Sequence, residues 1–153
     1  MSLKSKKLHP HAFLHFKDAD GAPMFADAAD GTPDTTRPMG ANLFGPGSKE
    51  YIRAKEEFDA ETFSALQKGT LKSNQPSFEQ KVKFVAACTH SWVNVDVPDE
   101  SNAPREPGTP PPMLAGADLT ATIWPDPAFI FLLEQAEVFV VKSRNFTAKP
   151  ATA

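Results

Sequence analysis

Histidines are the residues of this chain best suited to bind a metal, and three of them, His9, His11 and His15, lie close together near its start. A His-x-His pair places two imidazoles on one side of an extended chain, where both can reach the same ion. No cysteine or carboxylate lies nearby at a spacing typical of a metal site. We therefore interpret the three histidines as the entry to a strand and expect no bound metal.

A second candidate for metal chemistry is formed by Asp18, Asp20 and Gly21, which match the first part of a calcium-binding loop. Such a loop needs an acidic residue at its twelfth position, because that side chain completes the coordination of the ion. Counted from Asp18, the twelfth position holds Ala29. Asp and Gly are also ordinary turn residues, so we predict a turn here.

Catalytic chemistry has few candidates. Cys88 and His90 are two residues apart, so on a helix their side chains diverge and cannot act as a nucleophile and its base. Residues 40–48 are rich in glycine but end in Ser-Lys rather than in the Gly-Lys-Ser or Gly-Lys-Thr of a phosphate-binding loop. We find no catalytic residues and expect a protein that is not an enzyme and needs no cofactor.

The length of 153 residues predicts a single domain. We place this domain at residues 11–147, between disordered tails at 1–10 and 148–153. Residues 98–117 are predicted to be a surface loop, because six prolines between positions 98 and 112 exclude a helix or a central strand.

The formal net charge of −3 does not favour nucleic acid or an anionic membrane as a partner. Lys4, Lys6 and Lys7 are the only basic cluster, and we interpret them as part of a solvated tail. The apolar run at 128–141 contains acidic residues and is shorter than the roughly 20 residues of a membrane-spanning helix. The start of the chain lacks the pattern of a signal peptide, so we expect no export, and the single cysteine permits the reducing cytoplasm.

Residues 77–95 show the strongest helical pattern. Their apolar positions recur at spacings of four, three, four and three, which is the repeat of one helix face: Phe78, Val82, Val85, Thr89 and Trp92. Ser77 and Gln80 fit a capping box at the start of this helix. A second apolar stripe beside the first predicts a central helix that the other elements surround.

The remaining elements are assigned from local signals. Residues 12–17 and 23–26 are predicted to form a hairpin, and residues 39–44 a third strand. A helix is predicted to begin after Ser48 and to stop near Gly69. The predicted fold is therefore α+β and predominantly helical, with a short N-terminal β-hairpin or small antiparallel sheet followed by three main helices packed around helix 77–95.

The last helix, predicted over residues 127–142, carries apolar residues on two faces. One face is formed by Phe129, Leu132, Leu133, Ala136 and Val140, and it can meet the core. Phe131 and Val138 fall on the other face. We predict that these two residues bind a partner or a second copy of the chain. The alternative is that both belong to the core.

Three segments, in this order and spacing, resemble the prophage tail assembly chaperone family of long-tailed bacteriophages. They are LFGPGSKEYIRAKEEF at 43–58, FVAACTHSWVNVDV at 84–97 and PDPAFIFLLEQAEVFVVKSRNFT at 125–147. The proline-rich loop is longer than the connection usual in that family. The motifs are helical and contain no catalytic residues.

The resemblance implies a protein that binds the phage tape measure protein and keeps it soluble while the tail tube assembles. The tail tube protein is a further implied partner, and self-association is expected. Such a chaperone acts in the cytoplasm of the bacterial host and is absent from the mature virion. The alternative interpretation is a structural virion component, such as a head–tail connector or a tail terminator protein, which would stay in the particle.

Overall fold

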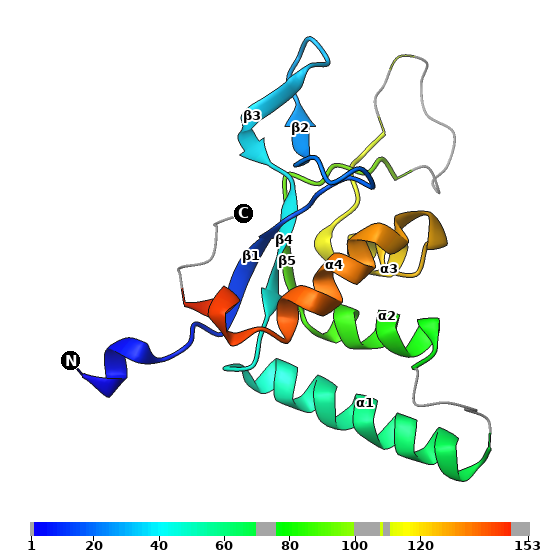
Figure 1. Cartoon of the computed structure of the whole chain (residues 1–153). Coiled ribbons are helices and arrows are strands. Elements are labelled where there is room, and N and C mark those ends of the chain that lie inside the picture. Colours follow the sequence, from blue (N-terminus) through cyan, green and yellow to red (C-terminus); the bar gives the residue numbers. More distant parts are fainter. Residues whose placement is uncertain (1, 70–75, 100–107, 109–110, 148–153) are drawn as a thin grey trace.

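The computed structural model describes residues 2–69, 76–99, 108 and 111–147. Within these residues the fold is α+β, 45% helical and 22% strand, with four α-helices and two small antiparallel sheets. The elements, with η for a 3₁₀ helix, are η1 (Leu3–Lys6), β1 (His11–His15), β2 (Phe25–Asp27), β3 (Pro33–Pro38), β4 (Gly40–Phe44), α1 (Lys49–Gln67), α2 (Phe78–Ala87), β5 (Thr89–Val93), α3 (Gly116–Ile123), η2 (Pro127–Phe129), α4 (Ile130–Val140) and η3 (Ser143–Phe146) (Figure 1). The predicted tail at 148–153 and much of the predicted proline-rich loop lie outside the described residues.

The larger sheet has the strand order β1-β4-β5, and both of its pairings are antiparallel. His15 of β1 lies opposite Gly40 of β4, which in turn lies opposite Val93 of β5. A Cβ atom on Gly40 would come within 2.0 Å of the Leu14 carbonyl oxygen. The close approach of the strands therefore requires glycine at this position.

The smaller sheet is a hairpin of β2 and β3, inserted between β1 and β4. At its base Phe16 donates its N–H to the Met39 carbonyl at 2.9 Å, and Met24 donates to the Phe16 carbonyl at 2.9 Å. Met39 donates in turn to the Met24 carbonyl at 3.0 Å. These three bonds join the hairpin to the larger sheet, from whose end it projects (Figure 1).

The prediction of a predominantly helical fold with an N-terminal hairpin is wrong. Residues 12–17 and 23–26 meet at one isolated bridge, between Lys17 and Pro23. Hydrogen bonds flank this bridge, from the Asp18 N–H to the Ala22 carbonyl at 2.8 Å and from the Met24 N–H to the Phe16 carbonyl at 2.9 Å. The pairing goes no farther because the Phe16 N–H donates to the Met39 carbonyl instead. Strand β1 pairs instead with β4, on the far side of the inserted hairpin.

The predicted central helix over residues 77–95 is also wrong, because α2 ends at Ala87 and the chain continues as β5. This strand contains the β-branched residues Thr89 and Val93 and the aromatic Trp92, which favour strands over helices. Trp92 reaches the core from the strand. The apolar spacing therefore did not distinguish the two conformations, as is common for short apolar segments.

The helix starts predicted after Ser48 and Ser77 are confirmed, whereas the helix predicted from residue 127 begins as the 3₁₀ helix η2 and becomes α4 only at Ile130. Ser48, Ser77 and Asp126 each accept a hydrogen bond from a backbone N–H in the first turn that follows them. Gln80 does not complete the predicted capping box. Its side-chain amide donates instead to the Phe58 carbonyl, 2.9 Å away on α1, so it holds two helices together.

Helices α2, α3 and α4 cover one face of the larger sheet, and α1 packs against α2 farther from the sheet (Figure 1). Phe16, Trp92 and Trp124 form an aromatic cluster in the core. The Trp124 indole N–H donates to the Thr89 hydroxyl at 3.0 Å, and that of Trp92 to the Thr120 hydroxyl at 2.9 Å. Because the buried indoles are hydrogen-bonded, the cluster joins sheet and α3 without an unsatisfied donor.

Candidate functional site

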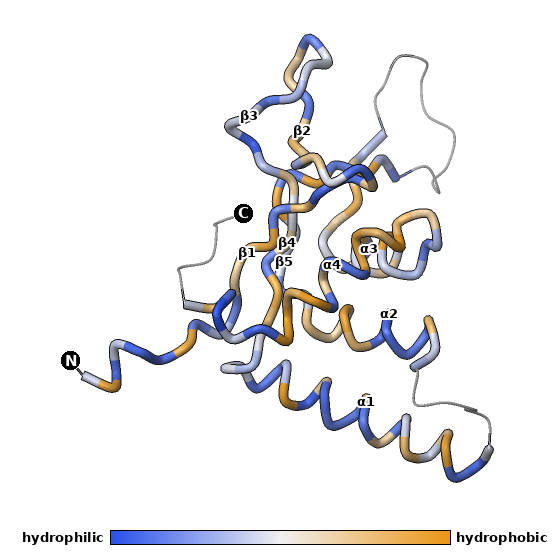
Figure 2. Tube along the Cα trace, in the orientation of Figure 1, coloured by the Kyte–Doolittle hydropathy of each residue, from blue (hydrophilic) through white to orange (hydrophobic). Residues whose placement is uncertain are grey.

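Helix α4 is apolar around most of its circumference (Figure 2). On the other side from the core, Ile130, Val138 and Val141 are 45%, 53% and 53% exposed. At 3.6 residues per turn, these three side chains fall within about 80° of the circumference. The side chains buried against the core are Leu132, Leu133, Ala136 and Val140. The exposed Glu134 lies in the same arc, one turn from Ile130 and from Val138, so the face carries three apolar side chains and one carboxylate. Three apolar side chains this exposed on one helix face are typical of a surface that another molecule covers.

A groove of about 450 Å³ runs between α4 and β1. Its apolar lining includes Leu14, Phe131, Val138 and Phe139. The structure thus brings the two predicted binding residues, Phe131 and Val138, into one groove. Phe131 is half-buried and also packs against the core, whereas Val138 is more than half exposed. That these residues bind a partner remains a prediction.

At the groove a side-chain amide of α4 bonds to the backbone of Lys17, two residues after the end of β1. Gln135 accepts a hydrogen bond from the Lys17 N–H at 2.8 Å and donates to the Lys17 carbonyl at 2.7 Å. The same amide donates to the Phe131 carbonyl at 3.0 Å. At the other end Asn145 donates to the Phe139 carbonyl at 2.9 Å. Gln135 therefore ties α4 to the residue that follows β1, and Asn145 ties η3 to the end of α4.

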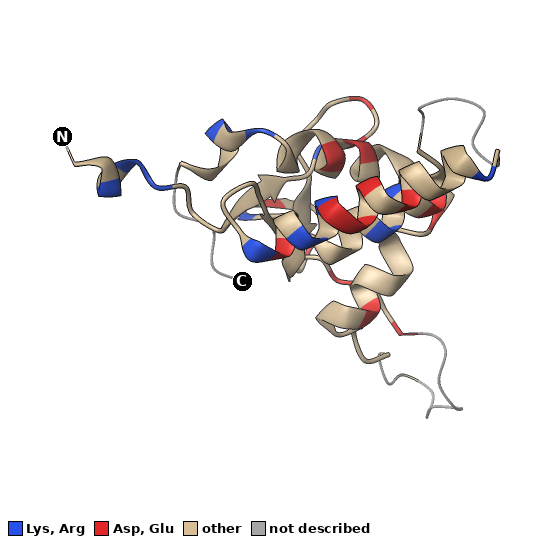
Figure 3. Ribbon diagram, turned by 90° about the horizontal axis from the view of Figure 1, so that it is seen from below, with Lys and Arg blue, Asp and Glu red and all other residues tan. Residues whose placement is uncertain are grey.

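The groove is edged by more positive than negative charge. Lys17, Lys142 and Arg144 contribute ammonium and guanidinium groups, against the single carboxylate of Glu134. None of the three cations forms an ion pair with another residue of the described chain. Acidic and basic residues are mixed on α1 and α2, whereas α3 and α4 carry only acidic ones and the N-terminal segment only basic ones (Figure 3). The groove therefore combines an apolar lining with a local excess of positive charge.

Helical periodicity identified Phe131 and Val138 but missed Leu14, Phe139 and Gln135. Leu14 lies on a strand that is far from α4 in the sequence, so no local pattern connects the two. Gln135 carried a usable signal, because a polar amide within an apolar helical run usually has a specific hydrogen-bond partner. The partner itself, a backbone unit 118 positions away, could not be identified from the sequence.

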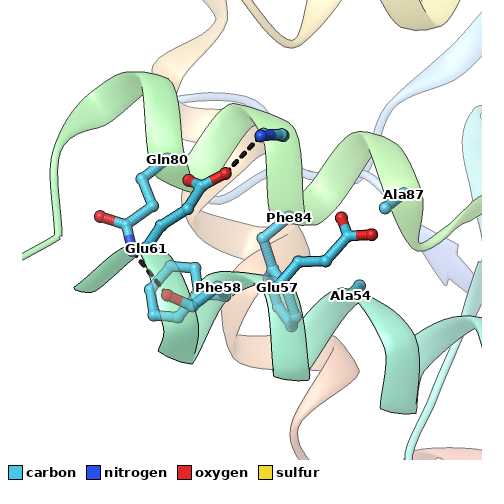
Figure 4. Close-up of a pocket in the computed structure, with 8 residues that line it drawn as sticks. Ala54, Glu57, Phe58, Glu61, Gln80, Phe84 and Ala87 are labelled. Carbon is cyan, nitrogen blue, oxygen red and sulfur yellow. Dashed lines mark hydrogen bonds and ion pairs between the residues drawn. The ribbon is translucent and has the colours of Figure 1, made fainter. Parts of the chain in front are cut away.

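Two other hollows fit the shielding of an apolar surface less well. Between α1 and α2, the Lys83–Glu61 ion pair and the Gln80 amide surround a space of about 10 Å³, which holds about one water (Figure 4). A groove of about 660 Å³ beside β5 and α3 is lined mostly by polar groups and edged by the Arg37–Asp96 ion pair. The groove beside α4 is the better candidate.

His9, His11 and His15 are not placed to share one metal ion. The His11 ring stacks on His90 with centroids 3.9 Å apart. The pKa of His11 is lowered mainly by burial and, to a smaller extent, by the charge of the neighbouring His90. His15 bonds through Nε2 to the Met24 carbonyl at 2.7 Å. Within the described chain, no three or more His, Cys, Asp or Glu side chains are placed to hold a metal ion.

Cys88 caps the end of α2 and is fully buried in the core. Burial raises the pKa of its thiol to about 12, so the thiolate is scarce at neutral pH. His90 follows on β5, where its ring stacks on His11. The two side chains therefore do not form a nucleophile and base pair.

The predicted turn at Asp18 is confirmed. Its carboxylate accepts hydrogen bonds from the N–H groups of Asp20 and Ala22, each at 2.9 Å. Gly21 follows with a φ of 87°, a left-handed conformation that favours glycine. These contacts account for the residues that resemble a calcium loop.

No protein-family model, curated protein or solved structure matches the chain. The resemblance to tail assembly chaperones therefore stays a prediction. In the described ranges, no helix is long and apolar enough to span a membrane.

Proposed function

We propose that this protein is a bacteriophage tail assembly chaperone that shields apolar helical surface of the tape measure protein with α4 and the groove beside it. The observation that carries the proposal is the exposure of Ile130, Val138 and Val141 on a helix whose opposite face is already buried. An amphipathic client helix can cover such a face by placing apolar residues three and four positions apart against it.

The strength of one contact can be estimated from the area that it covers. Burying roughly 600 Å² of apolar surface would contribute about 15 kcal/mol before opposing terms, at about 25 cal/mol per Å². Lost translational and rotational freedom and side-chain ordering offset much of this gain. A single copy would then bind weakly, while many copies along one client would hold firmly by raising one another's effective concentration. Weak individual contacts also allow tube subunits to displace the chaperone.

The test is a charged substitution on the exposed face. Val138→Asp should abolish retention of the tape measure protein in the soluble fraction when the two are co-expressed. A matched control, Ile52→Asp, changes a side chain of α1 that is 52% exposed and distant from the groove, and it should leave retention unchanged. Both variants should keep the wild-type circular dichroism spectrum. Full retention with Val138→Asp would contradict the proposal.

The alternative, a structural virion component, makes a different prediction for the finished particle. A chaperone acts in the host cytoplasm and is displaced, so mass spectrometry of purified virions should not detect this chain. A connector or terminator would be present in stoichiometric amounts.

A further inference from the structure

Strand β1 is an edge strand, and its outer edge borders the groove beside α4 (Figure 1). Phe16, just past the end of β1, directs its N–H and C=O toward Met39 and Met24 of the inserted hairpin. The next residue, Lys17, directs both groups the opposite way, toward Gln135 of α4. Backbone groups alternate in direction along a strand. The N–H and C=O groups of every second residue before Lys17 therefore also point outward.

These residues are His11, Phe13 and His15. Their outward backbone groups have no hydrogen-bond partner among the described residues, since β1 pairs only with β4 there. On each side of this stretch, the next residue whose backbone points outward is already hydrogen-bonded. Beyond one end Gln135 pairs with Lys17, and beyond the other the His9 N–H donates to the Phe146 carbonyl at 2.8 Å. The length between these ends matches a strand of about five residues.

Gln135 shows how this edge accepts a further chain. Its amide exchanges two hydrogen bonds with Lys17, at 2.8 and 2.7 Å, as a residue of a neighbouring antiparallel strand would do. A primary amide thus occupies the place of one peptide unit of an absent strand. An unpaired edge of this kind is a template for β-strand addition.

The charge around the edge selects among possible occupants. Lys17, Lys142 and Arg144 surround the groove and lack ion-pair partners in the described chain. A second copy paired through β1 would place the cations of both copies in one interface, which is unfavourable. The chain's own last six residues include Lys149 and no acidic residue. An acidic segment of another protein has the complementary charge.

We infer that the outer edge of β1 binds an extended segment of a partner protein, in which apolar residues alternate with acidic ones. The segment adds a strand through the backbone of His11, Phe13 and His15. Its apolar side chains enter the groove against Phe131 and Val138, and its acidic side chains lie near the three cations. This contact goes beyond the proposed function, because it recognises an extended backbone rather than a helix.

The probe is a seven-residue peptide of alternating Glu and Val with blocked ends, and its control carries Lys in place of Glu. Amide hydrogen exchange of the full chain is followed by nuclear magnetic resonance. The Glu peptide should slow exchange at His11, Phe13 and His15 by at least about tenfold, because these N–H groups become bonded. Exchange at Ala12 and Leu14, which already pair with β4, should not change. The Lys peptide should have no effect.

Two variants of His15 separate the contribution of its backbone N–H to peptide binding from that of its side chain. His15→Pro removes an outward N–H and leaves the pairing with β4 intact, as proline does on edge strands. His15→Ala loses the same imidazole and keeps the N–H. The Glu peptide should bind His15→Pro about five- to tenfold more weakly than His15→Ala. Equal binding, with both variants folded by circular dichroism, would overturn the inference.

Other occupants give distinct results. If exchange at the three outward amides slows with protein concentration in the absence of peptide, a second copy fills the edge and the inference is wrong. If an amphipathic helical peptide competes for the groove without protecting these amides, strand addition is also refuted, while the proposed helix-shielding function stands. Conversely, protection by the Glu peptide together with full client retention by Val138→Asp would support strand addition and contradict the proposed function.

Discussion

Gly45 gives the sharpest test of how the C-terminal segment closes the fold. A Cβ atom at this position would lie 2.2–2.4 Å from three ring atoms of Phe146, which is fully buried. The backbone of Gly45 cannot easily move away. Its N–H donates to the Pro10 carbonyl at 3.0 Å, and its carbonyl accepts from the Ser48 N–H at 2.9 Å. In Gly45→Ala the aromatic ring must therefore move.

The required displacement sets the size of the effect. Ordinary carbon–carbon contacts begin near 3.5 Å, so the ring has to retreat by more than about 1 Å. The Phe146 ring already packs edge-on against Phe139, with centroids 5.4 Å apart, which limits that movement. Overpacking of this kind typically costs 1–3 kcal/mol, and we expect about 3 kcal/mol. For a chain of this size the melting temperature should fall by about 6–12 °C.

Urea unfolding followed by circular dichroism measures the change in the free energy of unfolding. Gly116→Ala is the matched control, because nothing lies within 4 Å of its added Cβ atom, and it should change stability by less than about 0.5 kcal/mol. Phe146→Ala should remove most of the cost of Gly45→Ala when the two are combined, since the clash disappears. A loss below about 1 kcal/mol for Gly45→Ala alone would refute the packing described here.

Three further predictions concern single side chains. The Cys88 thiol, whose pKa burial raises to about 12, should react with a thiol reagent at pH 8 only after urea is added; rapid reaction in buffer would contradict its burial. Burial holds the pKa of His11 below its ordinary 6.5, so the unfolded chain binds the proton more readily. The free energy of unfolding should therefore fall as pH drops through 6.5 and below, and His11→Gln should flatten this pH dependence. An unchanged pH dependence in His11→Gln would contradict the burial of the His11 ring. Gln135→Leu removes both bonds to Lys17 and should cost about 1–2 kcal/mol in urea unfolding, while Glu134→Ala should cost little; equal effects would exclude a specific role for the amide.

Features set by neighbouring residues were predictable from the sequence. The caps at Ser48, Ser77 and Asp126 depend on a side chain and the next few N–H groups, and all three are present. The strand at residues 39–44 was predicted and corresponds to β4. In each case the deciding interaction lies within about one helical turn or one strand.

Strand pairing was not predictable in the same way. β1 passes over its nearest neighbour in the sequence and pairs with β4, because the inserted hairpin returns the chain beside it. β5 was assigned to a helix, since Thr89 and Trp92 continue the helical spacing of α2. Pairing with β4, which includes a register shift between Asn42 and Leu43, selects the strand instead. The groove shows the same division. Phe131 and Val138 were predicted from helical spacing, whereas the role of Gln135 depends on its hydrogen bonds to Lys17, which is distant in the sequence.

The central claim, that α4 and its groove bind the tape measure protein, is tested most directly by photocrosslinking in cells that are assembling tails. A photoreactive amino acid is placed at Val138 and, separately, at Ile52 of α1. We predict crosslinks to the tape measure protein from position 138 and none from position 52. Crosslinks from position 52 alone, or from neither position while tails assemble normally, would contradict the claim.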